Sequence, residues 1–226
     1  MKTIFKLTLA FLLSAVALVA QEEGAPQPTG FIRLVNGVAQ GTGPVYLTIN
    51  GENIRPSGYK LGDATGGIGL RPGSHKVTIK RDGVREGTTT VVLAKDQTVT
   101  LIPFAEKVPA SDEEPAYFKI QVLRLKQKNV DSGRVVTFVS VSSNPELKVE
   151  VQAEDGKWSS GFVKRLSVAE LPLNFTQGYA PAKVAGNPIK PIPIGGAGNY
   201  VLVLYDDPEE KVQSLYFRDF KFLSAD

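Results

Sequence analysis

Few residues of this sequence have the types and spacing that catalysis or metal binding requires. The chain of 226 residues contains no cysteine and a single histidine, His75. The absence of cysteine excludes disulfides, cysteine nucleophiles and thiolate metal sites, and a lone histidine excludes a multi-histidine metal centre. His75 follows a Pro-Gly-Ser turn and opens a strand, with no nucleophile or second ligand at a matching spacing. We therefore expect it to pack or hydrogen-bond at that turn.

Two other groups contain the residue types of a catalytic or metal-binding site but lack the spacing or secondary structure that such a site needs. Residues 57–60 (SGYK) match the Ser-x-x-Lys spacing of serine–lysine enzymes, but that spacing works on a helix, which the neighbouring proline and glycine disfavour. A cluster of carboxylates follows a strand, at Asp206, Asp207, Glu209 and Glu210. Such a cluster could hold calcium, but it lacks the Asp-x-Asp-x-Asp-Gly spacing, so a solvated acidic turn is expected. We expect no enzyme activity, no cofactor and no bound metal.

The charge balance does not indicate a nucleic-acid-binding protein. The formal net charge of +3 includes Lys2 and Lys6, and without them it falls to +1. A cluster of basic residues on one expected hairpin, Lys76, Lys80, Arg81 and Arg85, could form a rim that binds a polyanion or an acidic glycan. The same residues could instead protect a strand edge from aggregation, and this second interpretation needs fewer assumptions.

Residues 1–20 have the layout of a secretory signal peptide. Lys2 and Lys6 form a positive head, residues 7–13 are almost wholly apolar, and small residues follow up to Ala20. Cleavage after Ala20 is favoured and cleavage after Ala17 is the alternative. The apolar stretch is short for a retained membrane anchor, and no later segment is apolar enough to span a bilayer. The sequence predicts an extracytoplasmic protein: periplasmic, secreted or at the cell surface.

The rest of the chain indicates an all-β protein. Residues 21–28 are polar and proline-rich, and we expect a flexible leader. Short alternating runs with turn signals every 8–12 residues then fill residues 29–104 and 117–226, a pattern typical of antiparallel β-sandwiches. Residues 105–116 are acidic and contain two prolines, which suits a linker. The prediction is two tandem immunoglobulin-like β-sandwich domains, 29–104 and 117–226, after a signal peptide.

One segment interrupts this pattern. Residues 174–199 contain four prolines and five glycines, and structureless loops of that length are often functional. Within it, Ile189, Pro191, Ile192, Pro193 and Ile194 suggest an extended stretch with exposed isoleucines, because two prolines do not fit a central strand. We expect these five residues to contact a partner protein, or another copy of the chain.

Aromatic side chains offer a second kind of surface. Trp158, Tyr179, Tyr200 and Tyr205 lie near expected turns or the 174–199 segment, where they could stack on sugar rings. Strand aromatics are more often part of a core, so carbohydrate binding is the alternative function.

The first expected domain resembles the PEGA-type and related small β-sandwich modules of exported bacterial proteins. The resemblance rests on the segments VYLTING, LRPGSHKVTIKRDG and TTTVVLAKDQTVTL, and on their turn and core positions Asn50, Gly51, Leu70, Pro72, Gly73, His75, Val77, Ile79 and Gly83. The earlier segment FIRLVNG (residues 31–37) also fits this pattern. The resemblance implies an extracytoplasmic adhesion, scaffold or ligand-binding module without catalytic residues.

Together these features predict an exported, non-catalytic envelope or surface protein. We expect a protein-binding or scaffold role, with a place in a surface appendage or a secretion assembly as one setting. The partner would be an envelope protein or a second copy of the chain, with a glycan as the alternative ligand.

Overall fold

The structure, a computed structural model, describes residues 29–222. The signal peptide expected at 1–20 and the leader expected at 21–28 lie outside the described residues. Every regular element in the described part is a β-strand, which confirms the all-β prediction. Residues 29–222 contain no helix with the length and apolar character of a membrane span.

The N-terminal half, residues 29–126, is built from two sheets that pack face to face. Its strands are β1 (Gly30–Leu34), β2 (Thr42–Ile49), β3 (Glu52–Asn53), β4 (Ile68–Leu70), β5 (Gly73–Asp82), β6 (Val84–Leu93), β7 (Thr98–Val108) and β8 (Tyr117–Lys126). One sheet has the order β3-β2-β5-β6 and the other β8-β7-β1-β4, and a bridge between Arg85 and Lys119 joins them. Alternate apolar residues of both sheets, such as Leu47, Ile79 and Leu101, face each other in a buried core, as the period-two pattern requires.

The C-terminal half, residues 134–222, is also built from sheets around a core. Its strands are β9 (Arg134–Ser140), β10 (Glu146–Gln152), β11 (Trp158–Lys164), β12 (Val168–Pro172), β13 (Gly178–Ala180), β14 (Ala182–Val184), β15 (Asn187–Pro188), β16 (Ile192–Ile194), β17 (Gly198–Asp206) and β18 (Val212–Asp219). The sheets are β11-β10-β14-β15, β12-β9-β17-β18 and the small pair β13-β16. Phe138, Val149 and Leu202 are central to the core between them.

The two halves have the same pattern of strand pairing. In the N-terminal half, β1 pairs antiparallel with β4 and parallel with β7, which pairs antiparallel with β8. In the C-terminal half, β9 pairs antiparallel with β12 and parallel with β17, which pairs antiparallel with β18. The second sheet of each half also matches. In the N-terminal half, β2 pairs antiparallel with β3 and β5, and in the C-terminal half β10 pairs antiparallel with β11 and β14. Only β13 and β16 have no counterpart in the N-terminal half.

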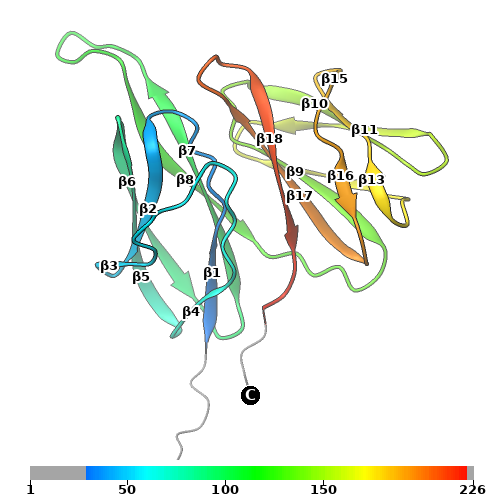
Figure 1. Cartoon of the computed structure of the whole chain (residues 1–226), viewed down its shortest axis with the longest axis horizontal. Helices are drawn as coiled ribbons and strands as arrows, with labels where there is room; N and C mark the ends of the chain where they lie inside the picture. Colours follow the sequence, from blue (N-terminus) through cyan, green and yellow to red (C-terminus); the bar gives the residue numbers. More distant parts are fainter. Residues whose placement is uncertain (1–28, 223–226) are drawn as a thin grey trace, which may run out of the picture.

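A third apolar cluster lies between the halves, which stand side by side (Figure 1). The N-terminal half contributes Ile102 and Phe104 of β7, and the C-terminal half contributes Val201 and Val203 of β17. Residues of β17 therefore alternate between two cores, since Tyr200, Leu202 and Leu204 face the interior of their own half. Because both faces of β17 are apolar and buried, the two halves pack as one body.

The boundary between the halves differs from the sequence prediction. Strand β7 continues to Val108, and β8 returns from Tyr117 to pair with it over ten residue pairs. Residues 105–116 are therefore the end of β7 and the tip of a hairpin, which projects at the upper left of Figure 1. The chain passes to the C-terminal half through residues 127–133. The expected linker was wrong because the prolines and charges of a solvated hairpin tip resemble those of an interdomain linker.

Packing between the halves predicts a measurable energetic contribution from Ile102, which is 0% exposed. We expect Ile102→Ala to lower the free energy of unfolding by about 2–5 kcal/mol, because it leaves a cavity between the two halves. Urea unfolding followed by circular dichroism measures this loss. Val92→Ala, at a position 67% exposed on β6, is the control and should change stability by less than about 0.5 kcal/mol. Equal effects of the two substitutions would contradict packing between the halves.

Candidate functional site

His75 has a structural environment, as the sequence indicates. The ring is 8% exposed, its Nε2 lies 2.8 Å from the carbonyl oxygen of Arg71, and its Nδ1 lies 3.0 Å from Nδ2 of Asn50. A carbonyl only accepts, so Nε2 donates, and Nδ1 accepts from the Asn50 amide. Asn50 in turn accepts from the amide of Lys76 at 3.0 Å. The histidine therefore ties two turns together, and both its ring nitrogens are occupied.

The Ser57–Lys60 stretch and the acidic turn are also explained by local structure. Oγ of Ser57 accepts from Nε of Arg55 at 3.0 Å, and Gly58 has φ of 66°, which places this stretch in a turn. Asp207 accepts the amides of Glu209 and Lys211 at 2.9 and 3.0 Å. The hydrogen bond from the Lys211 amide is the main cause that lowers the pKa of Asp207 below its ordinary value. No cluster of three or more potential metal ligands occurs within residues 29–222.

The 174–199 segment is not a structureless loop. It contains β13, β14, β15 and β16, and β13 pairs with β16 so that Ala180 lies opposite Ile192. Ile192 and Ile194 are 0% and 6% exposed in the core of the C-terminal half, and Ile189 packs against it. The expectation of exposed isoleucines is therefore wrong at 192 and 194, because the pairing turns alternate residues inward. Pro191 is exposed and Pro193 half-buried.

Most of the predicted basic rim is engaged within the chain. Lys80 forms an ion pair with Glu86 at 3.0 Å, and Arg85 forms one with Glu114 while its guanidinium stacks on the Tyr117 ring. Arg81 donates to the carbonyl oxygens of Val38 and Gly41. Of the four cationic residues, only Lys76 carries none of these contacts. Within residues 29–222, carboxylates pair with Lys80 and Arg85 alone, so the unpaired positive charge of the rim is reduced to Lys76 and Arg81.

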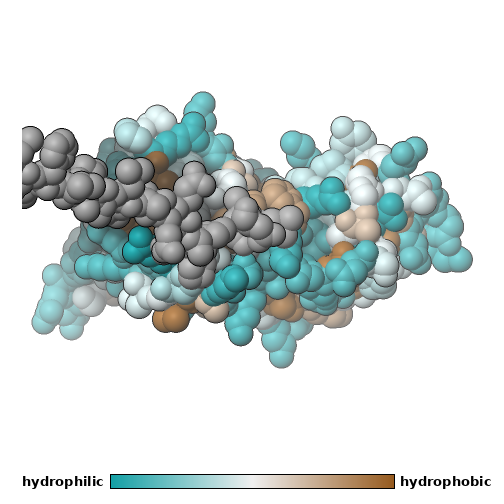
Figure 2. Space-filling view, turned by 90° about the horizontal axis from the view of Figure 1, so that it is seen from below, coloured by the Kyte–Doolittle hydropathy of each residue, from teal (hydrophilic) through white to brown (hydrophobic). Residues whose placement is uncertain are grey.

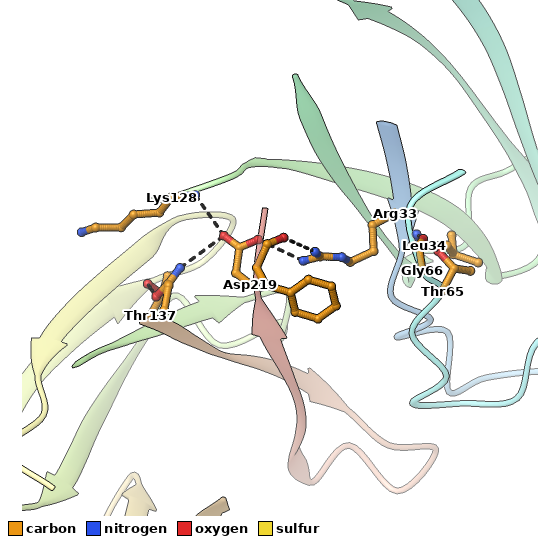
Figure 3. Close-up of polar contacts among 9 residues, drawn as sticks. Arg33, Leu34, Thr65, Gly66, Lys128, Thr137 and Asp219 are labelled. Atoms are coloured by element: carbon orange, nitrogen blue, oxygen red, sulfur yellow. Dashed lines mark hydrogen bonds and ion pairs between the residues drawn. The ribbon is translucent and has the colours of Figure 1, made fainter. Parts of the chain in front are cut away.

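A buried charge network connects β1 of the N-terminal half with the end of β18 of the C-terminal half (Figure 3). Nη1 of Arg33 on β1 donates to Oδ1 of Asp219 on β18 at 2.9 Å, and the two side chains are 2% and 1% exposed. Oδ2 of Asp219 accepts the amide of Lys128 at 2.9 Å and lies 3.4 Å from Nδ2 of Asn199. The Oδ1 atom of Asn199 accepts from the Thr137 hydroxyl at 2.6 Å. Because β1, β9, β17 and β18 all contribute, the network fixes the orientation of one half on the other.

Aromatic rings enclose the Arg33 guanidinium. Its Cζ lies 5.4, 5.0 and 4.6 Å from the ring centroids of Phe217, Phe220 and Phe222. Burial lowers the pKa of Arg33, and the carboxylate of Asp219 opposes that shift. The ion pair is sealed from solvent, so it cannot meet a substrate, and its role is to hold the halves together. Sequence reasoning missed it, because Arg33 has no local feature that distinguishes it from an outward-facing strand residue.

A groove of about 590 Å³ opens at the interface between the halves. Phe104 and Val141 form its floor, and two ion pairs cross between the halves at its rim: Arg165 with Glu106 at 2.6 Å, and Lys107 with Glu210 at 3.0 Å. These charges neutralise each other. The groove is therefore the solvent-facing margin of the interface between the halves, and its lining does not form a catalytic or ligand-binding arrangement.

Exposed apolar residues identify a different surface as the candidate site. Figure 2 shows a mainly hydrophilic face on which the apolar patches are small and separate. Half of the exposed large apolar residues described fall in residues 158–172, which we call the edge segment: Trp158, Phe162, Leu166 and Val168. The segment comprises β11, β12 and the turn between them. Phe162 is the most exposed of the four, at 63%.

The edge segment is also where two sheets end. β11 is the terminal strand of its sheet and β12 of the opposite one, and no described strand pairs with their outer sides. In β10, the carbonyl of Lys148 and the amide of Gln152 bond toward β14. The alternating ladder therefore directs the backbone groups of residues 159, 161 and 163 toward β10 and those of 158, 160, 162 and 164 outward. The carbonyl of Lys164 accepts from the amide and hydroxyl of Ser167, so the edge open to a partner is formed by the amides and carbonyls of residues 158, 160 and 162.

The same strand contains the exposed indole of the expected aromatic surface. Trp158 is 38% exposed, and Nζ of Lys183 lies 4.2 Å from its ring centroid. Tyr179 is 72% exposed, whereas Tyr200 and Tyr205 are 0% and 8% exposed and belong to buried clusters. The expectation that all four aromatics line a sugar platform is wrong for these two tyrosines, since β17 is buried on both faces.

The buried pair of Arg33 and Asp219 predicts a large, non-additive effect on stability. We expect Asp219→Asn to cost about 3–5 kcal/mol, because it leaves the Arg33 guanidinium buried without a counter-charge. The double variant Arg33→Met/Asp219→Leu should lose less than the sum of its single substitutions. Glu86→Gln, which breaks a pair more than half exposed, is the control, with a cost of at most about 1 kcal/mol. Additive effects in urea unfolding would contradict the pairing.

Comparison with known proteins adds no relationship to this geometry. No protein-family model matches the sequence, and no curated protein gives a significant match.

Proposed function

We propose that this chain is an exported, non-catalytic protein of two tandem immunoglobulin-like sandwiches that binds an extended segment of a partner protein along β11. The common pairing pattern of the two halves supports the tandem interpretation. The open edge of β11, bordered by exposed apolar side chains, is the observation that carries the binding function. A role as a scaffold or accessory protein of the cell envelope or surface agrees with the signal-like residues 1–20.

The physical argument rests on unsatisfied backbone groups. An exposed strand edge presents amides and carbonyls that another strand can pair with, and natural proteins usually block such edges with charges, prolines or bulges. Within β11, three of the four outward positions, 158, 160 and 162, are Trp, Ser and Phe, which are uncharged and keep their amides. The charge at the fourth position, Lys164, lies at the end of the strand. An added strand would gain main-chain hydrogen bonds along the edge and apolar contacts with the aromatic side chains.

The edge of β11 is preformed within its own sheet. β11 pairs with β10 over seven residue pairs, and Val163 of β11 is buried in the core of the C-terminal half. A strand that binds to a preformed edge loses less conformational freedom than one that must order its receptor. This suits a scaffold, in which the receptor surface stays fixed.

Carbohydrate binding through Trp158 has less support. The ammonium of Lys183 lies over the indole ring, where a sugar would stack, and two of the expected tyrosines are buried.

Strand addition at β11 predicts that a proline at position 160 abolishes binding. A library of linear peptides displayed on phage should yield sequences that bind the protein with wild-type Ser160. Ser160→Pro removes an outward amide while the ladder to β10 stays intact, so we expect these peptides to bind at least about tenfold more weakly. Ser160→Ala, which keeps the amide, is the matched control and should bind normally. Peptides that bind Ser160→Pro as well as they bind the wild type would exclude this edge.

Export predicts a shorter mature protein. Expressed in a bacterial host with its N-terminus intact, the chain should be recovered outside the cytoplasm with residues 1–20 removed. Intact-mass measurement gives the cleavage position, with Gln21 expected as the first residue. A chain that stays full-length in the cytoplasm would contradict the proposed location.

A further inference from the structure

We infer that the strand added to β11 is β11 of a second copy of this chain, related by a two-fold axis at Ser160. This inference rests on the proposed function, since it names the partner of the same edge. The two strands would run antiparallel, with Ser160 opposite Ser160 and Trp158 of each copy opposite Phe162 of the other. The two four-stranded sheets would then form one continuous sheet.

This register satisfies the backbone of the open edge. The two-fold register pairs 158 with 162, 160 with 160 and 162 with 158, which are the residues that form the open part of the edge. Each is a pair that exchanges both amide–carbonyl hydrogen bonds in an antiparallel ladder. All three amides and all three carbonyls in the open part of each copy therefore find partners. In a register shifted by one residue, the outward residues of one copy would lie opposite residues 159, 161 and 163 of the other, whose amides and carbonyls already bond to β10, so these hydrogen bonds would be lost.

The side chains of the outer face suit the same register. Trp158 and Phe162 are 38% and 63% exposed, and the pairing brings each indole beside a phenyl ring of the other copy, twice per dimer. Aromatic pairs across a ladder are among the stabilising cross-strand contacts. At the two-fold axis, the small Ser160 leaves no bulk or like charge opposite itself.

Charges beside the aromatic pairs are complementary. Lys164 at the end of β11 would lie opposite Gly156 of the second copy, in the turn that contains Glu154 and Asp155. Asp155 is already paired with Lys157 of the same turn at 2.9 Å, so the charge of Glu154 leaves the turn with a net charge of −1. Each copy therefore places Lys164 beside a turn of the other that has a net charge of −1.

The contact is isologous, so the same edge is used on both copies and the assembly closes as a dimer. A single short strand per copy makes a small interface, which implies a reversible dimer with a dissociation constant on the order of micromolar. The chain should therefore exchange between monomer and dimer within an experimentally accessible range of concentration.

Sedimentation velocity of the purified full chain over a range of micromolar concentrations tests the inference. We expect concentration-dependent dimerisation in the wild type and in Ser160→Ala. Ser160→Lys, which places like charges opposite each other at the two-fold axis, should weaken it at least about tenfold. Unchanged circular dichroism and urea unfolding verify that the variant is folded. A monomeric wild type, or a Ser160→Lys variant as dimeric as the wild type, would overturn the inference.

The chain contains no cysteine, so a single introduced thiol gives a second, independent measurement. Ser160→Cys should form a cross-linked dimer with a short bifunctional thiol reagent, because the two thiols meet at the two-fold axis. Ser132→Cys, at an exposed position in the connection between the halves, is the control and should remain monomeric. Equal cross-linking of the two variants would contradict the register.

These results separate the partner from the binding mode. A wild type that stays monomeric but binds library peptides in a manner sensitive to Ser160→Pro would overturn the second copy as partner and retain strand addition at β11. A wild type that neither dimerises nor binds peptides through β11 would overturn both.

Discussion

The structure depends on the burial of Arg33 against Asp219 between two apolar surfaces. A guanidinium and a carboxylate removed from water are tolerated only when they are paired and their remaining hydrogen-bonding groups are satisfied. Here the amide of Lys128, the carbonyl of Phe220 and a ring of phenylalanines complete that environment. The pair fits in one relative orientation of the halves, whereas the surrounding apolar contacts alone would tolerate sliding. The ion pair thus supplies orientation and the apolar cluster supplies stability.

Strand content followed from the sequence, but strand partners did not. Alternation marks a strand because one face is buried, and the alternating runs expected within 29–104 and 117–226 include β2, β5 and β10. The apolar run at residues 201–205 lies in β17, which is buried on both faces because it contacts two cores. Alternation does not reveal which strands are neighbours. The hairpin of β7 and β8 therefore looked like two domains separated by a linker.

The candidate site was less predictable than the fold. Arg33 and Asp219 are 186 residues apart, and no local pattern connects them. The short strands β13 to β16 are hidden among prolines and glycines, and their pairing, rather than their composition, buries Ile192 and Ile194. Trp158 was recognisable from the sequence as a possible stacking residue. Whether β11 has an unpaired edge depends instead on its position at the end of its sheet. That property belongs to the tertiary structure.

The common pairing pattern allows corresponding edge strands of the two halves to be compared, and these strands differ in length. By that pattern β3 is the counterpart of β11, since each is the outer neighbour of the corresponding strand, β2 or β10. β3 has two residues and β11 has seven. A molecule that associates through β11 alone can join only in pairs, whereas a second pairing edge at β3 would let it add copies without limit. The two-residue β3 is too short to pair with another copy. An insertion that lengthened β3 would give the chain a second pairing edge, and such a chain could assemble into filaments.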